Sequence, residues 1–209
     1  HFSLSPLLTV ESLELDGAEL VEVDERLGYR QFRLDPPLAA GSETELRWSL
    51  DWRNEGFPNS GATTRLVENG TFVNNTEIMP LPGYVRGREL QDSNVRRRYG
   101  LAPVERLPQL GDPKFLHAGL FGVANRSRFR ATVSTSPDQI ALAPGYLLDE
   151  TLENDRRTFV YEMDAPIWPF VSITSARYAV ASDSWNEVAL EVYYHPDHDF
   201  NVASMIESS

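Results

Sequence analysis

Alternation of apolar and polar residues with a period of two is the feature that most constrains how this chain folds. In residues 44–52, two leucines and two tryptophans alternate with charged or hydroxyl residues. Successive side chains of a strand point to opposite faces of a sheet, so this segment predicts a half-buried strand. Similar apolar, β-branched and aromatic runs predict further strands at 10–15, 20–23, 31–34, 129–134, 158–163, 170–180 and 188–194.

These short strands are separated by glycine and proline turns, and a helical period is almost absent. That pattern predicts an all-β chain folded as an antiparallel β-sandwich. With 209 residues, of which 41% are hydrophobic, the chain is long enough to bury a core as one domain over residues 1–209. Because residues 1–4 already alternate, we expect the domain to be N-terminally truncated, beginning inside a strand whose free edge needs a cover.

The middle of the chain differs from both flanks. At about 54–116 the alternation fades and glycine and proline multiply, which predicts a long, irregular insertion. Within it only residues 92–99 resemble a helix, with Asp92 or Ser93 as N-cap and Gly100 just after the last turn. We therefore expect a partly helical insertion in the sandwich.

Composition excludes several classes of function. The formal net charge of -12 would repel a phosphate backbone, so nucleic acid is not expected as a partner. The chain has no cysteine, which excludes disulfides, thiolate metal sites and cysteine nucleophiles. No apolar run approaches the roughly 20 residues that cross a bilayer as a helix.

Several stretches together resemble the N-terminal β-sandwich domain of aminopeptidase N-type (gluzincin) zinc metallopeptidases. The similarity is greatest to the bacterial branch fused to multi-spanning, ABC-permease-like membrane proteins. The stretches are GYRQFRLDPPLAAGSETELRWSLDW at 28–52, ENGTFVNN at 68–75, LPGY at 81–84, REL at 88–90, the arginine-rich helix after it, and TSPDQIALAPG at 135–145.

This resemblance implies a saddle-like, non-catalytic domain beside a thermolysin-like catalytic domain. In that family an H-E-x-x-H motif and a downstream glutamate bind zinc, and neither that motif nor the family's Gly-rich exopeptidase motif occurs in these residues. The chain itself is then not an enzyme and holds no cofactor or metal, and zinc belongs to the missing C-terminal catalytic domain. The parent is a zinc metallo-aminopeptidase or an inactive relative.

The resemblance also implies partners and a location. The domain would shape the peptide-substrate cleft and dock on its own C-terminal catalytic domain, in a parent anchored to the membrane. It would lie on the extracytoplasmic side of the bacterial cell membrane. The alternative is an independent extracytoplasmic β-sandwich that serves as a binding or scaffold module, with a complete, well-covered surface and a concave site of its own.

The family comparison indicates substrate-facing candidates. Relatives carry a glutamine about a strand's length before a proline-cysteine turn, and counting back from Pro80 places Asn69 nearest that position, with Glu68 beside it. Here asparagine replaces the glutamine, and no cysteine follows Pro80. The structural alternative is that Asn69 and Gly70 form a type I′ hairpin turn.

Two charged segments complete the candidates. Arg96, Arg97 and Arg98 belong to a cluster of arginines in an otherwise acidic chain, and they are candidates for contact with a catalytic domain, a carboxylate or anionic lipid. The alternative is a solvated helix with internal ion pairs. Residues 195–199, HPDHD, hold possible metal ligands, but their spacing suits neither a helix nor a strand face, so we expect a structural role and no metal.

Overall fold

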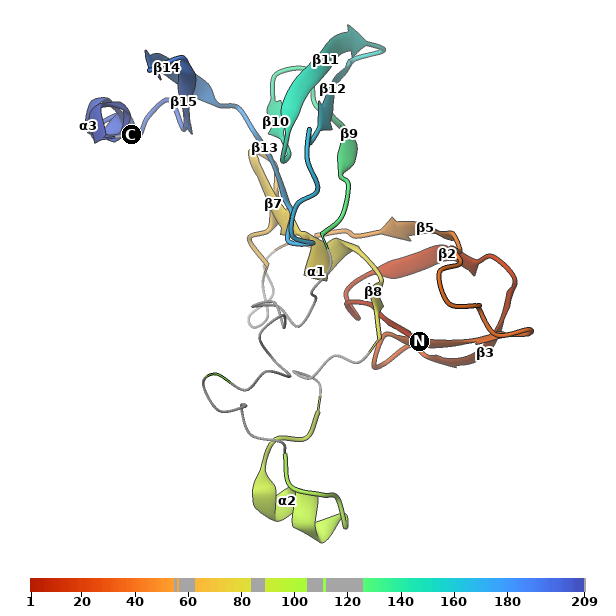
Figure 1. Cartoon of the computed structure of the whole chain (residues 1–209). Helices are drawn as coiled ribbons and strands as arrows, with labels where there is room; N and C mark the ends of the chain where they lie inside the picture. Colours follow the sequence, from red (N-terminus) through yellow and green to blue (C-terminus); the bar gives the residue numbers. More distant parts are fainter. Residues whose placement is uncertain (55, 57–62, 84–88, 105–110, 112–125, 209) are drawn as a thin grey trace. The chain divides into compact units, whose positions relative to one another are not determined.

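The computed structural model describes residues 1–54, 56, 63–83, 89–104, 111 and 126–208 (Figure 1). These residues form strands in several antiparallel sheets, together with three short helices. The prediction of a mostly β chain is therefore confirmed. No helix among the described residues is long and apolar enough to cross a membrane.

Backbone contacts divide the chain into two compact units. Unit 1 holds His1–Arg53 and Asn75–Arg126, and unit 2 holds Asn54–Asn74 and Ser127–Ser209. The chain thus passes from unit 1 to unit 2, back again, and once more to unit 2. The single domain expected from the sequence stays a prediction, and each unit is described by itself.

Unit 1 contains two antiparallel sheets. One has the strand order β3-β4-β1-β8 and the other pairs β2 with β5. Because β1 is paired on both sides, the free edge expected near the N-terminus is covered by neighbouring strands. The strands and helices of unit 1 are β1 (Phe2–Ser3), β2 (Thr9–Leu15), β3 (Ala18–Asp24), β4 (Tyr29–Leu34), β5 (Leu46–Asp51), α1 (Asn75–Ile78), β8 (Leu81–Pro82) and α2 (Ser93–Arg98).

The best-buried point of unit 1 is the close approach of Leu4 to Gly28. Leu4 is almost fully buried, and its N–H donates to the carbonyl oxygen of Gly28 at 2.7 Å. Gly28 has φ +63°, and a Cβ built there would lie 2.2 Å from the carbonyl oxygen of Leu4. Only glycine fits this position, because both its backbone conformation and the space exclude a side chain.

Unit 2 contains three antiparallel sheets. Their strand orders are β10-β13-β7-β6, β11-β12-β9 and β14-β15. The strands and helix are β6 (Leu66–Val67), β7 (Gly70–Asn74), β9 (Arg130–Thr135), β10 (Ile140–Leu142), β11 (Tyr146–Glu153), β12 (Arg156–Glu162), β13 (Ser172–Ala176), β14 (Ala179–Trp185), β15 (Val188–Tyr194) and α3 (Val202–Ser208).

The core of unit 2 lies between β12 and β10. Phe159 and Tyr161 project from β12 and pack with Ala141 of β10, and all three residues are buried. The Tyr161 hydroxyl donates to the carbonyl oxygen of Ala141 at 2.9 Å, so its polar atom is satisfied inside the core. Burial raises the pKa of this tyrosine. Apolar packing and this hydrogen bond thus help to join the two sheets.

Two tight hairpins in unit 2 have local causes. Asn154 and Asp155 connect β11 to β12, and Asn186 and Glu187 connect β14 to β15. All four residues have positive φ, between 46° and 70°. Positive φ at both central residues defines a type I′ turn, whose twist matches that of the flanking strands.

The helix predicted at residues 92–99 is confirmed as α2. The Asp92 side chain accepts from the backbone N–H groups of Asn94 and Val95, at 2.9 and 2.8 Å, and so caps the first turn. After the last turn, Gly100 has φ +67°, and its N–H and that of Leu101 donate back to helix carbonyls. Both ends are therefore capped by residues that the sequence indicated.

The rest of the expected insertion differs from the prediction. Within the described part of 54–116 the helices are only α1 and α2, so a long helical insertion is not seen. Strands β6, β7 and β8 occupy positions where irregular chain was expected. They are only two to five residues long, too short for a period of two to stand out in the sequence.

Candidate functional site

The substrate-facing candidates Glu68 and Asn69 form the turn between β6 and β7. Val67 pairs with Gly70, so these two residues connect the strands. The expected type I′ turn at Asn69 and Gly70 is wrong, because Gly70 already belongs to β7 and none of these described residues has a positive φ. Hydrogen bonds to other parts of unit 2 hold the turn instead.

Asn69 is fixed by the residue that follows β13. Its Oδ1 atom accepts from the backbone N–H of Arg177 at 2.8 Å, across 108 residues of sequence. The amide nitrogen of Asn69 finds no partner among the described residues and is left as a donor. The side chain is half-buried, so its orientation is set by unit 2 rather than by solvent.

Arg177 links the turn to a second loop. Its Nε donates to the Asp138 carboxylate, and its terminal nitrogen lies 3.7 Å from the Glu68 carboxylate. The hydrogen bond from Arg177 lowers the pKa of the Asp138 carboxyl, and the same contact raises the pKa of the Arg177 guanidinium. The Glu68 side chain is nevertheless 92% exposed, so its carboxylate faces water.

A buried polar cluster lies beneath the turn. Gln139 donates from Nε2 to the carbonyl oxygen of Glu68 at 2.8 Å. The Gln139 Oε1 atom lies 3.1 Å from the Thr135 hydroxyl and 2.8 Å from the Ser175 hydroxyl, and these hydroxyls are 2.6 Å apart. Thr135, Gln139 and Ser175 are buried, so the cluster pins the turn where water cannot compete for the bonds.

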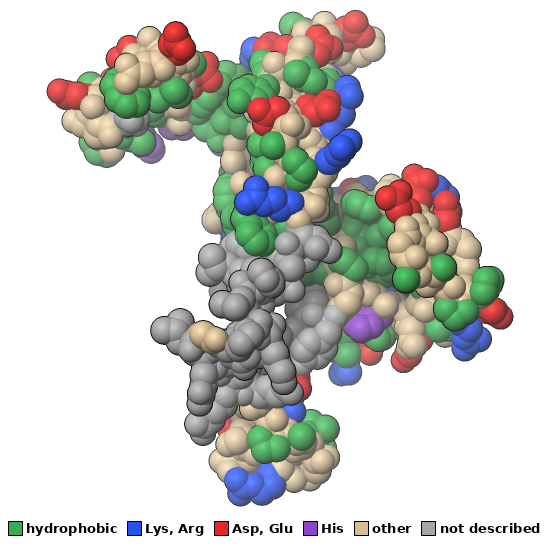
Figure 2. Space-filling model, viewed as in Figure 1, with side chains coloured by type: hydrophobic (Ala, Val, Ile, Leu, Met, Phe, Trp, Pro, Cys, Tyr) green, Lys and Arg blue, Asp and Glu red, His purple; other side chains and the backbone are tan. Residues whose placement is uncertain are grey.

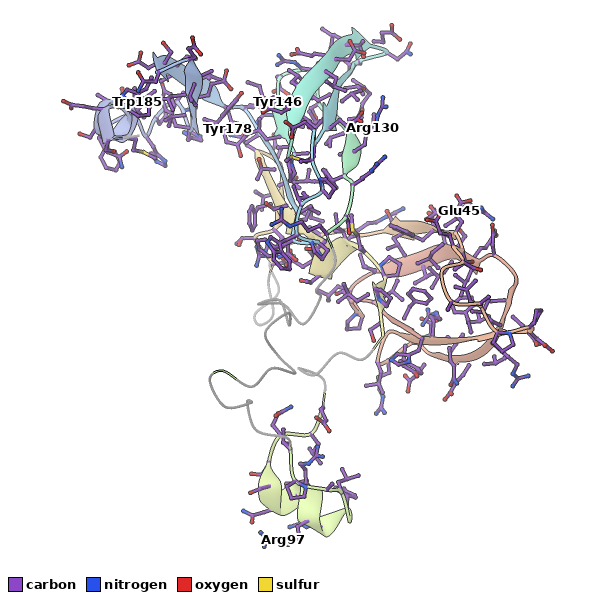
Figure 3. All side chains as sticks on the ribbon, in the orientation of Figure 1. Glu45, Arg97, Arg130, Tyr146, Tyr178 and Trp185 are labelled. Carbon is purple, nitrogen blue, oxygen red and sulfur yellow. The ribbon has the colours of Figure 1, made fainter. Side chains whose placement is uncertain are left out.

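A small hollow adjoins the turn. It has a volume of about 280 Å³, and it is bordered by Asn69, Phe72, Arg177, Tyr178 and His195, among other residues. Tyr178, labelled in Figure 3, is the second residue after β13. Pockets for small ligands usually measure roughly 300–1,000 Å³, so this hollow suits a single side chain better than a whole cofactor.

The two histidines of residues 195–199 make local contacts, and His195 borders this hollow. The rings of His195 and His198 are 5.0 Å apart, and His195 Nδ1 accepts from the Asp197 backbone N–H at 3.2 Å. Nowhere in the described ranges do three or more His, Cys, Asp or Glu side chains gather as metal ligands. These contacts fit a local turn after β15.

The three arginine candidates differ from one another. Arg96 is buried and donates to Glu89, at 2.9 Å, and to the carbonyl oxygens of Leu90 and Ala102. Arg97 and Arg98 are exposed. Arg96 therefore holds the α2 segment together, and only Arg97 and Arg98 can contact a partner. The remaining cluster residues, Arg86, Arg88 and Arg106, lie outside the described residues.

Sequence reasoning singled out Glu68 and Asn69, but it placed the turn one residue too late and missed what holds it. Gln139 and Asp138 lie in the TSPDQ stretch that carries the family resemblance, and that stretch was the only signal available for them. Ser175 and Arg177 carried no signal, because their partners are far away in sequence. In comparisons with known proteins, no family model matches this chain and no curated protein shows a significant match to it.

Replacing Arg177 with glutamine is expected to raise the pKa of Asp138 toward its ordinary value, because the hydrogen bond that lowers it is lost. The Asp138 carboxylate stabilises the folded chain above its unfolded-state pKa, and this contribution is lost as pH falls through the lower folded-state pKa. NMR titration of the Asp138 side chain measures the shift. The Arg156→Gln variant is the control, and an unchanged Asp138 pKa in Arg177→Gln would contradict the assigned ion pair.

Proposed function

We propose that this chain is the non-catalytic N-terminal domain of a zinc aminopeptidase-like membrane protein. In this proposal it shapes the peptide-substrate cleft and docks on a catalytic domain outside these 209 residues. The observation that carries the proposal is the Glu68–Asn69 turn, which unit 2 fixes through Arg177 and Gln139 while the Glu68 carboxylate stays exposed. An exposed carboxylate on a turn whose backbone is held in place suits the free amino group of a peptide.

Exposed apolar residues support the docking part of the proposal. All eight residues of β11 are exposed, and Tyr146, Leu147, Leu148 and Leu152 are among the exposed large hydrophobic residues. Figure 2 shows hydrophobic side chains on the surface of the β11–β12 hairpin. Apolar strands left open to water are typical of an interface separated from its partner. The independent module considered as the alternative would instead have a well-covered surface.

The proposal includes the finer fold and setting that the family resemblance implies. The sheets would stack as a saddle-like antiparallel β-sandwich, and the parent would be anchored in the bacterial membrane with this domain on the extracytoplasmic side. Zinc would be bound by the catalytic domain, and peptides would be the substrates. An experimental structure of the full-length parent would test the stacking of the sheets.

The gene sequence beyond Ser209 gives the most direct test. We expect H-E-x-x-H and a downstream glutamate within the next ~150 residues, about the length of one domain. The 209-residue chain, purified and loaded with zinc, is expected to cleave no aminoacyl substrate. Cleavage by this chain would show that the proposal is wrong, and so would a following sequence that encodes no thermolysin-like domain.

In the full-length enzyme, Glu68→Gln is expected to raise KM for peptides with a free amino terminus by about tenfold, because a charge-assisted contact is worth roughly 1.5 kcal/mol or more. Steady-state kinetics on aminoacyl substrates measure this change. Glu19→Gln, which removes an exposed carboxylate in β3, is the matched control. If Glu68→Gln and Asn69→Ala both leave KM and kcat unchanged, neither residue faces the substrate.

A further inference from the structure

The α2 segment, residues 89–102, closes on itself. Asp92 caps the first turn, and the N–H of Leu101 donates to the carbonyl oxygen of Arg96 beyond the last turn, at 2.9 Å. The buried Arg96 side chain then joins Glu89, before the helix, to Ala102, after it. Caps at both ends and the Arg96 bonds between the flanking residues hold this short helix. Its outer residues therefore keep a fixed arrangement along the backbone.

The last turn of this segment presents two arginines beside two apolar side chains. We call Arg97, Arg98, Tyr99 and Leu101 the α2 patch. Both arginines are exposed, Tyr99 is 70% exposed and Leu101 is 47% exposed. Figure 2 shows basic and hydrophobic side chains together on this segment, and Arg97 is labelled in Figure 3.

The charge of the α2 patch is not neutralised within the described part of the chain. Of the two acidic residues in the segment, Glu89 pairs with Arg96 and Asp92 caps the helix. Neither Arg97 nor Arg98 forms an ion pair with a described residue. Against a chain of net charge -12, these two guanidinium groups form a local cationic spot. An anionic partner would therefore be drawn to the α2 patch rather than to the chain as a whole.

The mixture of side chains favours an anionic lipid surface over an acidic protein. Arginine binds phosphate groups through paired N–H donors, and tyrosine is enriched where membrane meets water. Burial of a leucine side chain at the boundary between headgroups and acyl chains strengthens binding, because it removes apolar surface from water. A protein partner would need a pocket shaped for the projecting Tyr99, whereas a lipid surface adapts to it.

We propose that the α2 patch contacts the anionic headgroups of the membrane next to which this domain is held. The inference rests on the proposed function, because a membrane-anchored parent keeps the α2 patch close to lipid and so raises the local concentration of its partner. The α2 patch would thus attach the domain to the membrane through its own residues, in addition to the anchor of the parent.

Vesicle flotation of the 209-residue chain tests the contact. We expect the chain to bind vesicles rich in phosphatidylglycerol and not vesicles of phosphatidylcholine alone, with binding that weakens as salt is added. Each arginine near an anionic surface strengthens binding about fivefold, so R97Q/R98Q is expected to weaken it about 25-fold. R97K/R98K keeps both charges and is expected to keep most of the binding.

The control is R26Q/R33Q, which removes two exposed arginines of unit 1 and gives the same net charge as R97Q/R98Q. The proposal is wrong if the chain binds neither kind of vesicle, if it binds both equally, or if this control loses as much binding as R97Q/R98Q. It is also wrong if R97Q/R98Q binds the vesicles as tightly as the unsubstituted chain does. That result would leave another protein as the partner of the α2 patch.

A site-specific probe gives a second measurement. Because the chain has no cysteine, an environment-sensitive dye can be placed at Ala102→Cys alone, next to the α2 patch. Its emission is expected to shift to the blue on phosphatidylglycerol vesicles, while the same dye at Ser184→Cys in β14 stays unchanged. Equal shifts at both sites would contradict a contact through α2. Failure here leaves the peptidase assignment intact, since that depends on the sequence beyond Ser209.

Discussion

Phe159→Ala is expected to lower the free energy of unfolding of unit 2 by about 3–5 kcal/mol, the usual cost of removing a buried aromatic ring. Phe159 is 1% exposed and packs with Tyr161 and Ala141. The Arg157 guanidinium also lies over its ring, 5.1 Å from the centre. The substitution leaves a cavity between the two sheets. Few other buried residues lie there, so neighbouring side chains cannot easily fill it.

Urea unfolding followed by circular dichroism, with hydrogen exchange of β9 and β12 amides to identify unit 2, measures this loss. Phe200→Ala is the matched control, because Phe200 is also in unit 2 but is 88% exposed. Its effect should stay within about 0.5 kcal/mol. Equal effects of the two substitutions would show that Phe159 is not the centre of the core.

Gly145→Ala is expected to destabilise unit 2 by about 2–4 kcal/mol, since backbone strain and steric overlap act together. Gly145 lies between β10 and β11 with φ +109°, a conformation that other residues rarely adopt. A Cβ at this position would lie 2.5 Å from the carbonyl carbon and oxygen of Glu162 in β12. The backbone of Glu162 cannot move aside without disturbing the pairing of β12 with β11.

Gly17→Ala separates the two causes. Gly17 also has a positive φ, of +72°, but its Cβ would meet nothing within 4 Å. Its substitution should cost only about 1 kcal/mol, the conformational part alone. Urea unfolding of both variants gives the comparison. If Gly145→Ala costs no more than Gly17→Ala, the overlap with Glu162 does not exist in solution.

Strands with a clear alternation could be predicted from the sequence. The segment expected at 44–52 is β5, Leu46–Asp51, and most other predicted strands lie within a few residues of observed ones. The single strand expected at 170–180 is wrong, because the chain there leaves β13 at Ala176 and enters β14, in another sheet, at Ala179. The burial was overestimated, since Trp48 is 42% exposed in a sheet of only two strands. A period of two shows which side chains share a face, but the depth of burial depends on what covers that face.

Strand β11 shows why other elements were missed. It pairs with β12 along its whole length, but the register shifts between Leu147 and Asp149. The extra residue breaks the alternation at that point, and the segment YLLDETLE then lacks the pattern of a half-buried strand. The position of a bulge depends on the register with the partner strand, so the sequence of β11 alone does not predict it.

The candidate site divides in the same way. The α2 caps could be predicted because Asp92 and Gly100 act on residues beside them in sequence. The family resemblance singled out Glu68 and Asn69 as substrate-facing candidates, but the turn that they form was expected one residue later. Its supports, Gln139 and Arg177, could not be predicted, because their bonds to the turn cross 71 and 108 residues. Local chemistry is visible in a sequence, whereas long-range pairing follows only from the fold.

The pairing of β7 with β13 matters during synthesis of the protein. Asn74 pairs with Ser172 and Thr71 with Ser175, so β7 leaves the ribosome about a hundred residues before its partner. At roughly 5–20 residues per second, that delay lasts about 5–20 s. During this delay one edge of β7, which contains the apolar residues Phe72 and Val73, has no partner strand. An unpaired apolar strand edge is a surface that chaperones bind.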